Sequence, residues 1–515
     1  MPVRMEKDDN RRSKDNYPGR RRRPSTGGGG GNNPLVYLIP LLLKKPKLLL
    51  VVAVIGGLWY FFGGGCSGLE GGGETTQNIV ENLFSTGLEY SAEKHENTAI
   101  YEPLADNIKN PLPESFSLEA YAPKRLSQGK QGSCVAWAAS YAGRTILESR
   151  RTGKNPNQLA FSPSYLYNQI ALTNCQGSYL PDAMENLQEG GVLPFREFGY
   201  DERSCSDKPN SSERERAQDY TIHGFQRLSK SDNAREVDLL AVKQHIAQGA
   251  PVVIGMMVGG SFMQGMHGKN VWIPSATDYD QRGFGGHAMC VIGYDDYLEG
   301  GAFEIMNSWG EDWGNDGVAY VRYKDFDYFV REAYGMDPMG NADAPFGSRL
   351  TAEIGLKMND GGYMRFHQGM EGMFSTADPV EIGDKFKVEI TNDKPCYIYV
   401  FGEETDGSSY VLFPYTEKHS PYCGITGTRL FPRDYSMKTD DVGNRDHIAI
   451  VITQDPIDYN DFNQRLSSGQ GTYANKLQSL LGVQNVRFEG GNMIDFSADL
   501  AKEEMIGVVI SIDKQ

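Results

Sequence analysis

The chain has 515 residues and a net charge of −16, with 39% hydrophobic and 11% aromatic residues. This length and composition predict a globular protein of two or three domains. The charge is uneven, because residues 1–47 hold 12 of the 51 Lys and Arg but only 4 of the 67 Asp and Glu. The rest of the chain is therefore strongly acidic, which argues against nucleic acid as its main partner.

The first 65 residues predict a tail and a membrane anchor. Residues 1–47 are expected to form a basic, disordered cytoplasmic tail, and residues 48–65 a single transmembrane helix. The uncharged run from Leu48 to Phe62 spans about 22 Å as a helix, which is short of a hydrocarbon core of about 30 Å unless Gly63–Gly65 and Lys47 extend it. The basic residues before it favour a cytoplasmic N-terminus and an extracytoplasmic body, periplasmic or at the cell surface. Cys66 leaves an alternative open, a lipoprotein anchored there after signal cleavage.

Residues 66–111 are expected to form a stalk, and residues 112–336 the first folded domain. The first half of this domain reads as helical, and Ser162 and Pro163 are typical of an N-cap and a first helical turn. Its second half reads as strands. These are expected at Val252–Val258, Ala288–Tyr294, Phe303–Met306 and Val318–Tyr323, with a polar surface loop at Cys205–Gln218.

Residues 345–515 predict an all-β sandwich. Phe386, Val388 and Ile390 alternate with charged residues, as in a half-buried strand. The aspartates at 440–441 and 458–461 are interpreted as solvated loops, with a calcium site as the alternative. Further elements are expected at Cys396–Phe401, Tyr410–Phe413, His447–Ile452 and Ile506–Ile512 (strands) and near Asn475–Leu481 (a helix).

Three short segments contain residues suited to thiol catalysis: Gln128–Cys134, Gly285–Ala288 and Asn307–Gly310. Only a thiolate attacks a carbonyl well, and an ordinary thiol has a pKa of about 8.5. Cys134 begins a predicted helix, whose N-terminus favours an anion. An imidazolium at His287 would favour the thiolate further and later protonate a leaving amine.

The three segments resemble the papain family of cysteine peptidases. The resemblance implies an α+β fold of two lobes, one helical and one β-barrel-like, with the cleft between them. It also implies a role for each matching residue. Cys134 is the nucleophile, His287 the acid and base, Asn307 the residue that orients His287, and Gln128 the oxyanion donor; Gly177, Ser178, Gly286 and Trp309 bind or border the substrate.

The sequence departs from the family pattern at several positions. Val135 stands where the family has Trp, and Gln131 where it has a cysteine that forms a disulfide with the position of Cys175. Cys175 is therefore expected to pair with Cys205 or to stay free, and a Cys396–Cys423 disulfide is also possible outside the cytoplasm. The chain between anchor and domain is too short for the family's usual inhibitory propeptide, so latency by that route is doubtful.

These features predict a membrane-anchored, bacterial, papain-like endopeptidase that works through a thioester and needs no cofactor or metal. A peptide or protein is the expected substrate. Transpeptidation or amide ligation by the same residues stays open, as does a binding or scaffold role. The C-terminal segments Gly383–Asp384, Cys396–Val400 and Leu412–Pro414 resemble an uncharacterised domain of bacterial surface peptidases, whose partner is unknown.

Overall fold

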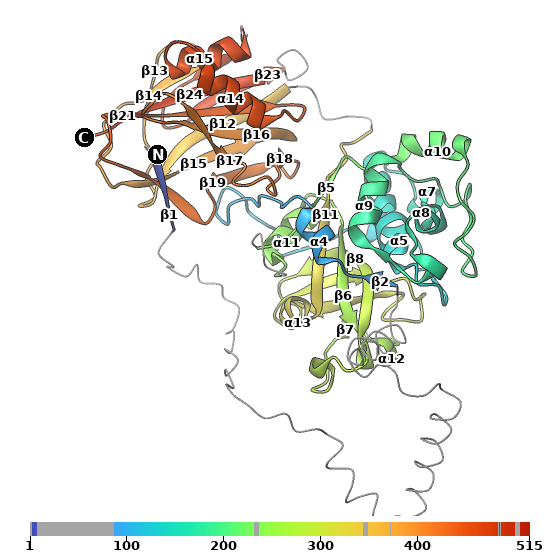
Figure 1. The fold of residues 1–515 in the computed structure, drawn as a ribbon. Helices are drawn as coiled ribbons and strands as arrows, with labels where there is room; N and C mark the ends of the chain where they lie inside the picture. The colour runs from blue at the N-terminus through green and yellow to red at the C-terminus, as the bar shows by residue number, and fades with distance from the viewer. Residues whose placement is uncertain are drawn as a thin grey trace, which may run out of the picture. The chain divides into compact units, whose positions relative to one another are not determined.

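The computed structural model describes residues 3–7, 87–230, 236–342, 349–370, 372–482, 484, 486–499 and 505–515 (Figure 1). The expected anchor at 48–65 and the alternative lipid site at Cys66 lie outside these residues. Among the helices of the described ranges, none is both long and apolar enough to cross a membrane.

The helical half of the first domain is built around one long helical run. Helix α5 (Cys134–Ala136) continues through a π-helical stretch, Trp137–Arg144, into α6 (Thr145–Thr152). Gly153 ends the run with a φ of 67°, a left-handed conformation that glycine adopts without strain. The helices that follow are α7 (Pro156–Leu159), α8 (Pro163–Ile170), α9 (Leu180–Glu189) and α10 (Ser211–Ala217).

Two expectations about these helices are now decided. The Ser162 hydroxyl accepts the amide of Tyr165 at 3.0 Å, so the predicted cap of α8 is confirmed. The surface loop expected at Cys205–Gln218 is wrong in part, because this segment contains α10. A capping box between Asn210 and Glu213 satisfies the first amides of that helix and explains why such a polar stretch is helical.

The second half of the domain is an eight-stranded sheet in the order β5-β11-β6-β8-β9-β10-β7, with β3 paired to β8. The four strands expected from the sequence are confirmed as β6, β8, β9 and β10. The helices of this half are α11 (Leu239–Ala247), α12 (Gly260–Gln264) and α13 (Tyr323–Phe329). The strands are β3 (Ser115–Ser117), β5 (Phe225–Arg227), β6 (Val252–Val258), β7 (Val271–Trp272), β8 (Gly285–Asp295), β9 (Ala302–Met306), β10 (Val318–Arg322) and β11 (Val330–Met336).

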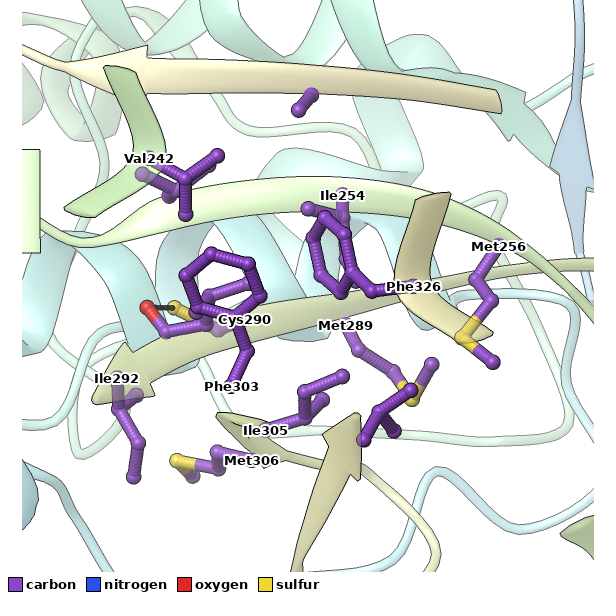
Figure 2. Packing of buried hydrophobic residues seen from close by; sticks show 14 of the residues in the cluster. Val242, Ile254, Met256, Met289, Cys290, Ile292, Phe303, Ile305, Met306 and Phe326 are labelled. Atoms are coloured by element: carbon purple, nitrogen blue, oxygen red, sulfur yellow. Dashed lines mark hydrogen bonds between the residues drawn. The ribbon is translucent and has the colours of Figure 1, made fainter. Parts of the chain in front are cut away.

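Apolar side chains from neighbouring strands of this sheet pack into one core, together with residues of α11 and α13 (Figure 2). Ile254 of β6, Cys290 of β8 and Phe303 of β9 are fully buried in it. This packing holds β8 rigidly, which matters because β8 also carries His287. The core thus fixes one side of the expected catalytic site.

The C-terminal domain contains two seven-stranded sheets with a shared apolar core. The first sheet has the order β1-β20-β15-β12-β23-β22, with β19 on β15, and the second β13-β14-β24-β21-β16-β17, with β18 on β16. Helices α14 (Tyr459–Ser468) and α15 (Tyr473–Leu481) pack with β16, β21 and β24 in a second core. The expected β-rich architecture is confirmed, and the helix expected near Asn475–Leu481 is α15, whereas α14 was not expected. The strands are β1 (Val3–Lys7), β12 (Arg349–Met358), β13 (Phe366–Gln368), β14 (Met373–Thr376), β15 (Lys385–Asn392), β16 (Cys396–Glu403), β17 (Ser409–Phe413), β18 (Tyr422–Cys423), β19 (Gly427–Phe431), β20 (Tyr435–Thr439), β21 (Arg445–Thr453), β22 (Arg487–Glu489), β23 (Ile494–Asp499) and β24 (Met505–Asp513).

Three expectations for this domain need correction. Asp458 does not lie in a solvated loop, because its carboxylate caps α14 by accepting the amides of Asn460 and Asp461. Within the described ranges, no group of acidic, His or Cys side chains could hold a metal, so the calcium alternative has no support there. Cys396 and Cys423 face each other on β16 and β18 but are both free.

Two N-terminal segments are more ordered than expected. Val3–Lys7, assigned to a disordered tail, forms β1 and pairs antiparallel with β20. The described part of the expected stalk, residues 87–111, packs onto the first domain. Strand β2 (Leu88–Glu89) pairs in parallel with β4 (Ser178–Tyr179), and α4 (Ala92–Asn97) follows it.

Candidate active site

Cys134 lies at the N-terminus of the long helical run and is completely buried. It is a free cysteine, and its Sγ accepts the backbone amide of Ala288, the residue after His287, at 3.4 Å. The unpaired amides and dipole at the start of a helix favour a negative charge at this position. The helix from one half of the domain and β8 from the other thus meet at the thiol.

His287 is held by Asn307, which follows β9. His287 Nε2 lies 2.7 Å from Asn307 Oδ1, and the same oxygen accepts the amide of Ser308 at 2.7 Å. An oxygen that already accepts an amide proton acts as an acceptor toward the ring as well, so Nε2 carries the ring proton. Nδ1 is then the basic nitrogen, and it is buried without a hydrogen bond to any described residue.

An aromatic group covers the His287–Asn307 hydrogen bond. The Trp309 ring stacks on His287 with centroids 4.4 Å apart and planes 24° apart. Phe262 and Trp313 in turn contact Trp309, each at 6.0 Å between centroids. Because a hydrogen bond is stronger where water is excluded, this group helps to fix the orientation of the imidazole.

Gln128 is positioned by the same segment that carries Asn307. Its side-chain amide nitrogen donates to the Gln131 carbonyl at 2.8 Å, while its Oε1 accepts the Ser308 hydroxyl at 2.6 Å. The Tyr200 hydroxyl, which the sequence did not single out, lies 2.7 Å from both the Gln128 carbonyl and Ser133 Oγ. The loop before Cys134 is therefore tied down at both ends.

Burial controls the charge of His287 in this structure. Burial lowers the pKa of His287 to about 4, while the hydrogen bond that His287 donates to Asn307 acts in the opposite direction. The imidazole is therefore neutral near pH 7. The thiolate–imidazolium pair that the sequence suggested is not favoured in this arrangement, because a buried imidazolium would lose its hydration.

The chain's own residues occupy the cleft where substrate is expected. The Ser178 amide donates to the Gly87 carbonyl at 3.0 Å, which pairs β2 with β4. A methyl group added to Gly177 would lie 2.7 Å from the Gly87 oxygen, and one added to Gly286 would lie 2.5 Å from the Leu88 oxygen. The three backbone positions expected to bind substrate are thus all in contact with residues 87–88.

Leu88 and Glu332 are site residues that the sequence did not reveal. Leu88 is 7% exposed and belongs to the buried cluster that contains Cys134 and Ala288. Its Cδ2 and the Glu332 side chain approach the same point beside Gly255. No local pattern marks either residue, because their contact depends on strands that are far apart in the sequence.

Cys175 and Cys205 form a disulfide across a separation of 30 residues, so the pairing expected for Cys175 is confirmed. The Tyr167 hydroxyl donates to the Cys175 carbonyl at 2.7 Å and accepts the Gly177 amide at 3.2 Å. The disulfide therefore fixes the loop that presents Gly177 and Ser178 to the cleft.

A thiol, a histidine and an asparagine come together where the helical half meets the sheet half, an arrangement typical of a cysteine protease site. Residues 113–333 match the family model described as papain family cysteine protease, and residues 380–456 match a domain of unknown function, DUF4384. The chain therefore carries a papain-family cysteine protease domain followed by a DUF4384 domain.

Curated relatives match part of this chain. An uncharacterised peptidase C1-like protein of Acanthamoeba polyphaga mimivirus is 28% identical over 221 residues, which cover 41% of this chain and 66% of that protein. Cathepsin K of Mus musculus is 26% identical over 261 residues, 48% of this chain and 70% of the relative. Among solved structures, xylellain, a cysteine protease from Xylella fastidiosa, matches with a TM-score of 0.41 and 22% identity, over 48% of this chain and 94% of that chain.

Proposed function

We propose that this protein hydrolyses peptide bonds in peptide or protein substrates, with Cys134 as nucleophile. The observation that carries the proposal is the 2.7 Å contact between His287 Nε2 and Asn307 Oδ1, which leaves Nδ1 as the basic nitrogen of a residue whose neighbour, Ala288, donates its amide to the thiol. A histidine that only supported the fold would not need its ring to be oriented in this way.

The chemistry follows from the positions of these groups. Nδ1 of His287 takes the Cys134 proton, and the thiolate attacks the substrate carbonyl carbon. The Gln128 amide and the Cys134 backbone N–H are the assigned donors to the oxyanion, each worth about 3 kcal/mol in such sites. His287 then gives its proton to the leaving amine as the C–N bond breaks. Water, deprotonated by His287, hydrolyses the thioester and restores the thiol.

The form described here is proposed to be latent. Gly87 uses the Ser178 amide that a substrate backbone would need, and Leu88 covers Gly286 beside His287. Substrate must therefore displace residues 87–89 before it can bind. Residues 87–89 thus provide latency without the family's usual inhibitory propeptide.

The test is labelling of the full chain with a thiol-directed peptidyl epoxide. Label is expected on Cys134 only, with none in Cys134→Ala and a rate at least tenfold lower in His287→Ala. Cys290→Ala is the matched control, because Cys290 is also free and fully buried but lies in the sheet core. Equal labelling of the parent and His287→Ala would refute thiol activation by His287.

Anchoring outside the cytoplasm through residues 48–65, or through a lipid at Cys66, is part of the same proposal. The uncharged run at 48–62 and the basic residues before it support it. The pairing of β1 with β20 competes with this topology, because a single span would separate the two strands. The anchored chain must therefore have β1 unpaired.

Protease protection in sealed membrane vesicles tests this topology, with one epitope tag before residue 3 and another after residue 515. Tags protected on opposite sides, with the protein retained after a high-salt wash, are expected for a single span. A lipid anchor at Cys66 would instead leave no intact N-terminal tag on the mature protein. Both tags on the same side of an uncleaved chain would refute the single-span anchor.

A further inference from the structure

Residues 99–105, here called the strap, lead from α4 to the junction of the protease domain and the C-terminal domain. They run beside β5, the edge strand of the protease sheet. The Arg227 amide donates to the Ala99 carbonyl at 2.9 Å, and the Tyr101 amide donates to the Arg227 carbonyl at 3.1 Å. The strap therefore extends the protease sheet by one short parallel pairing.

The other side of the strap pairs with the C-terminal domain. The Ile100 amide donates to the Lys418 carbonyl at 2.7 Å, and the Ser420 amide donates to the Ile100 carbonyl at 2.9 Å. Further along, the Ala105 amide donates to the Thr428 carbonyl of β19 at 2.9 Å. Its backbone groups thus bond to both sides, as in a strand in the middle of a sheet, so the strap joins the two domains.

The C-terminal domain also holds the strap with a buried arginine, Arg429 of β19. This side chain donates to the Glu102 carbonyl at 3.0 Å, to Asn392 Oδ1 at 3.1 Å and to the Ile425 carbonyl at 2.7 Å. Arg429 is completely buried, so each acceptor that it loses leaves a buried N–H group unpaired. Removal of the strap alone would take away one of these three acceptors. The strap is therefore stabilised as long as Arg429 stays in place.

The turn between β18 and β19 adds an apolar contact. Ile425 is completely buried in the same core as Tyr101 and Leu104 of the strap. The neighbouring Thr426 pairs with Gln248, which follows α11. Its amide donates to Gln248 Oε1 at 2.9 Å, and its carbonyl accepts Gln248 Nε2 at 2.5 Å. Ile425 and the strap thus share one core, and Gln248 attaches the turn to the protease domain.

The strap continues directly into the segment that occupies the cleft. Helix α4 joins the two and contacts the protease domain at two side chains. Lys94 Nζ lies 2.7 Å from Asp182 Oδ1, and His95 Nδ1 lies 2.9 Å from the Tyr334 hydroxyl. Strand β2 has only two residues, so its own contacts are few. A bound strap orders this part of the chain in advance and so reduces the entropy that β2 loses when it enters the cleft.

We propose that the C-terminal domain acts as an intramolecular inhibitor, which binds the strap and thereby keeps residues 87–89 in the cleft. Separation of the β18–β19 turn from the strap is then the activating step. The inference rests on the proposed peptidase function and its latent form, and it adds a role for the domain of unknown function. A domain that served only to bind a distant partner would not need to share a buried core with the segment that closes the cleft.

The first test weakens the contact with the strap without changing the cleft or the strap itself. Ile425→Ala in the full chain is expected to raise the initial rate of cleavage of a fluorogenic peptide about tenfold, because the shared core loses a buried side chain. Ile448→Ala is the matched control, since Ile448 is equally buried but lies in the core of the C-terminal sheets. Thermal unfolding is measured alongside, and Gln248→Ala, which should raise the rate in the same direction, replaces Ile425→Ala if that variant does not fold.

The outcomes separate the two levels of inference. Cleavage that depends on Cys134 but is no faster in Ile425→Ala and Gln248→Ala than in the parent overturns the inhibitory role and keeps the peptidase. An equal rise in Ile448→Ala also overturns this role, because the rise would not come from the contact with the strap. No cleavage by any variant and no labelling of Cys134 overturns the proposed function itself.

A second test does not depend on activity. Amide hydrogen exchange is measured for Ile100 in the strap and for Ser178, whose amide donates to Gly87 in the cleft. In Ile425→Ala both amides should exchange about tenfold faster than in the parent, whereas neither should change in Ile448→Ala. Faster exchange of Ile100 with unchanged exchange of Ser178 would show that the strap and the cleft open independently, and would overturn the proposal.

Discussion

Shortening Leu88 should release the catalytic site. Leu88 is 7% exposed and packs among Gly255, Gly286 and the Glu332 side chain, while the β2–β4 pairing adds one backbone hydrogen bond at 3.0 Å. Buried Leu→Ala changes cost about 2–5 kcal/mol. Residues 87–89 can partly relax around the smaller side chain. We therefore expect the free energy that favours the closed form over the open form to fall by about 2–3 kcal/mol. Each 1.36 kcal/mol changes an equilibrium constant tenfold, so the fraction of molecules with an open cleft rises by about 30- to 150-fold.

The assay is the initial rate of cleavage of a fluorogenic peptide by full-length Leu88→Ala and by the parent. A rise in rate that approaches this factor, with the same site labelled at Cys134, is the expected result. Ile108→Ala is the matched control, because Ile108 lies in the same N-terminal region but is 96% exposed. If Leu88→Ala and Ile108→Ala both cleave no faster than the parent, Leu88 does not control access to the cleft.

Three further predictions concern the residues around the thiol. The folded-state pKa of His287 is depressed to about 4, so unfolding takes up a proton between pH 6.5 and 4 and the free energy of unfolding should fall on acidification, by up to about 3 kcal/mol from this group. Calorimetry across this range should show a smaller decrease in His287→Ala, and parallel decreases would contradict a buried neutral imidazole. Asn307→Ala removes the acceptor at 2.7 Å and should lower kcat by about 10- to 100-fold with little change in KM; an unchanged kcat would show that the imidazole is oriented by other contacts. The double variant Cys175→Ser/Cys205→Ser opens a loop of 30 residues and should lower the free energy of unfolding by roughly 3–4 kcal/mol, and a urea midpoint equal to the parent's would refute this contribution.

The candidate catalytic residues could be proposed from sequence because each lies in a short segment that forms most of its own local structure. Cys134 begins a helix and follows a turn, and Asn307 precedes a Trp and a Gly that fix the backbone around it. These local structures depend on neighbouring residues in the chain, so a few consecutive residues specify them. The strand that carries His287 and the strand that precedes Asn307 were predictable for the same reason, since both are mainly apolar runs.

The occupied cleft could not be predicted in this way. Strand β2 has only two residues, and its pairing partner Ser178 lies 90 positions later. The two residues of β2 form no sequence pattern that predicts this pairing. The contact exists because the Cys134 helix, β4 and β6 create a space that a leucine fits. Glu332 was missed for a similar reason, because a charged residue in a strand is normally taken to face solvent, whereas Glu332 is 1% exposed beside Gly255.

Occupation of the cleft and the neutral state of His287 belong together. Leu88 lies over Gly286, the residue next to His287, and the imidazole has a lowered pKa because it is buried. When the segment leaves, we expect water to return to this part of the cleft, so the imidazolium becomes less costly and the thiolate–imidazolium pair can form. Substrate access and activation of the nucleophile are then consequences of one movement. The closed chain is then inhibited in two ways, because its substrate donors are occupied and its imidazole is neutral.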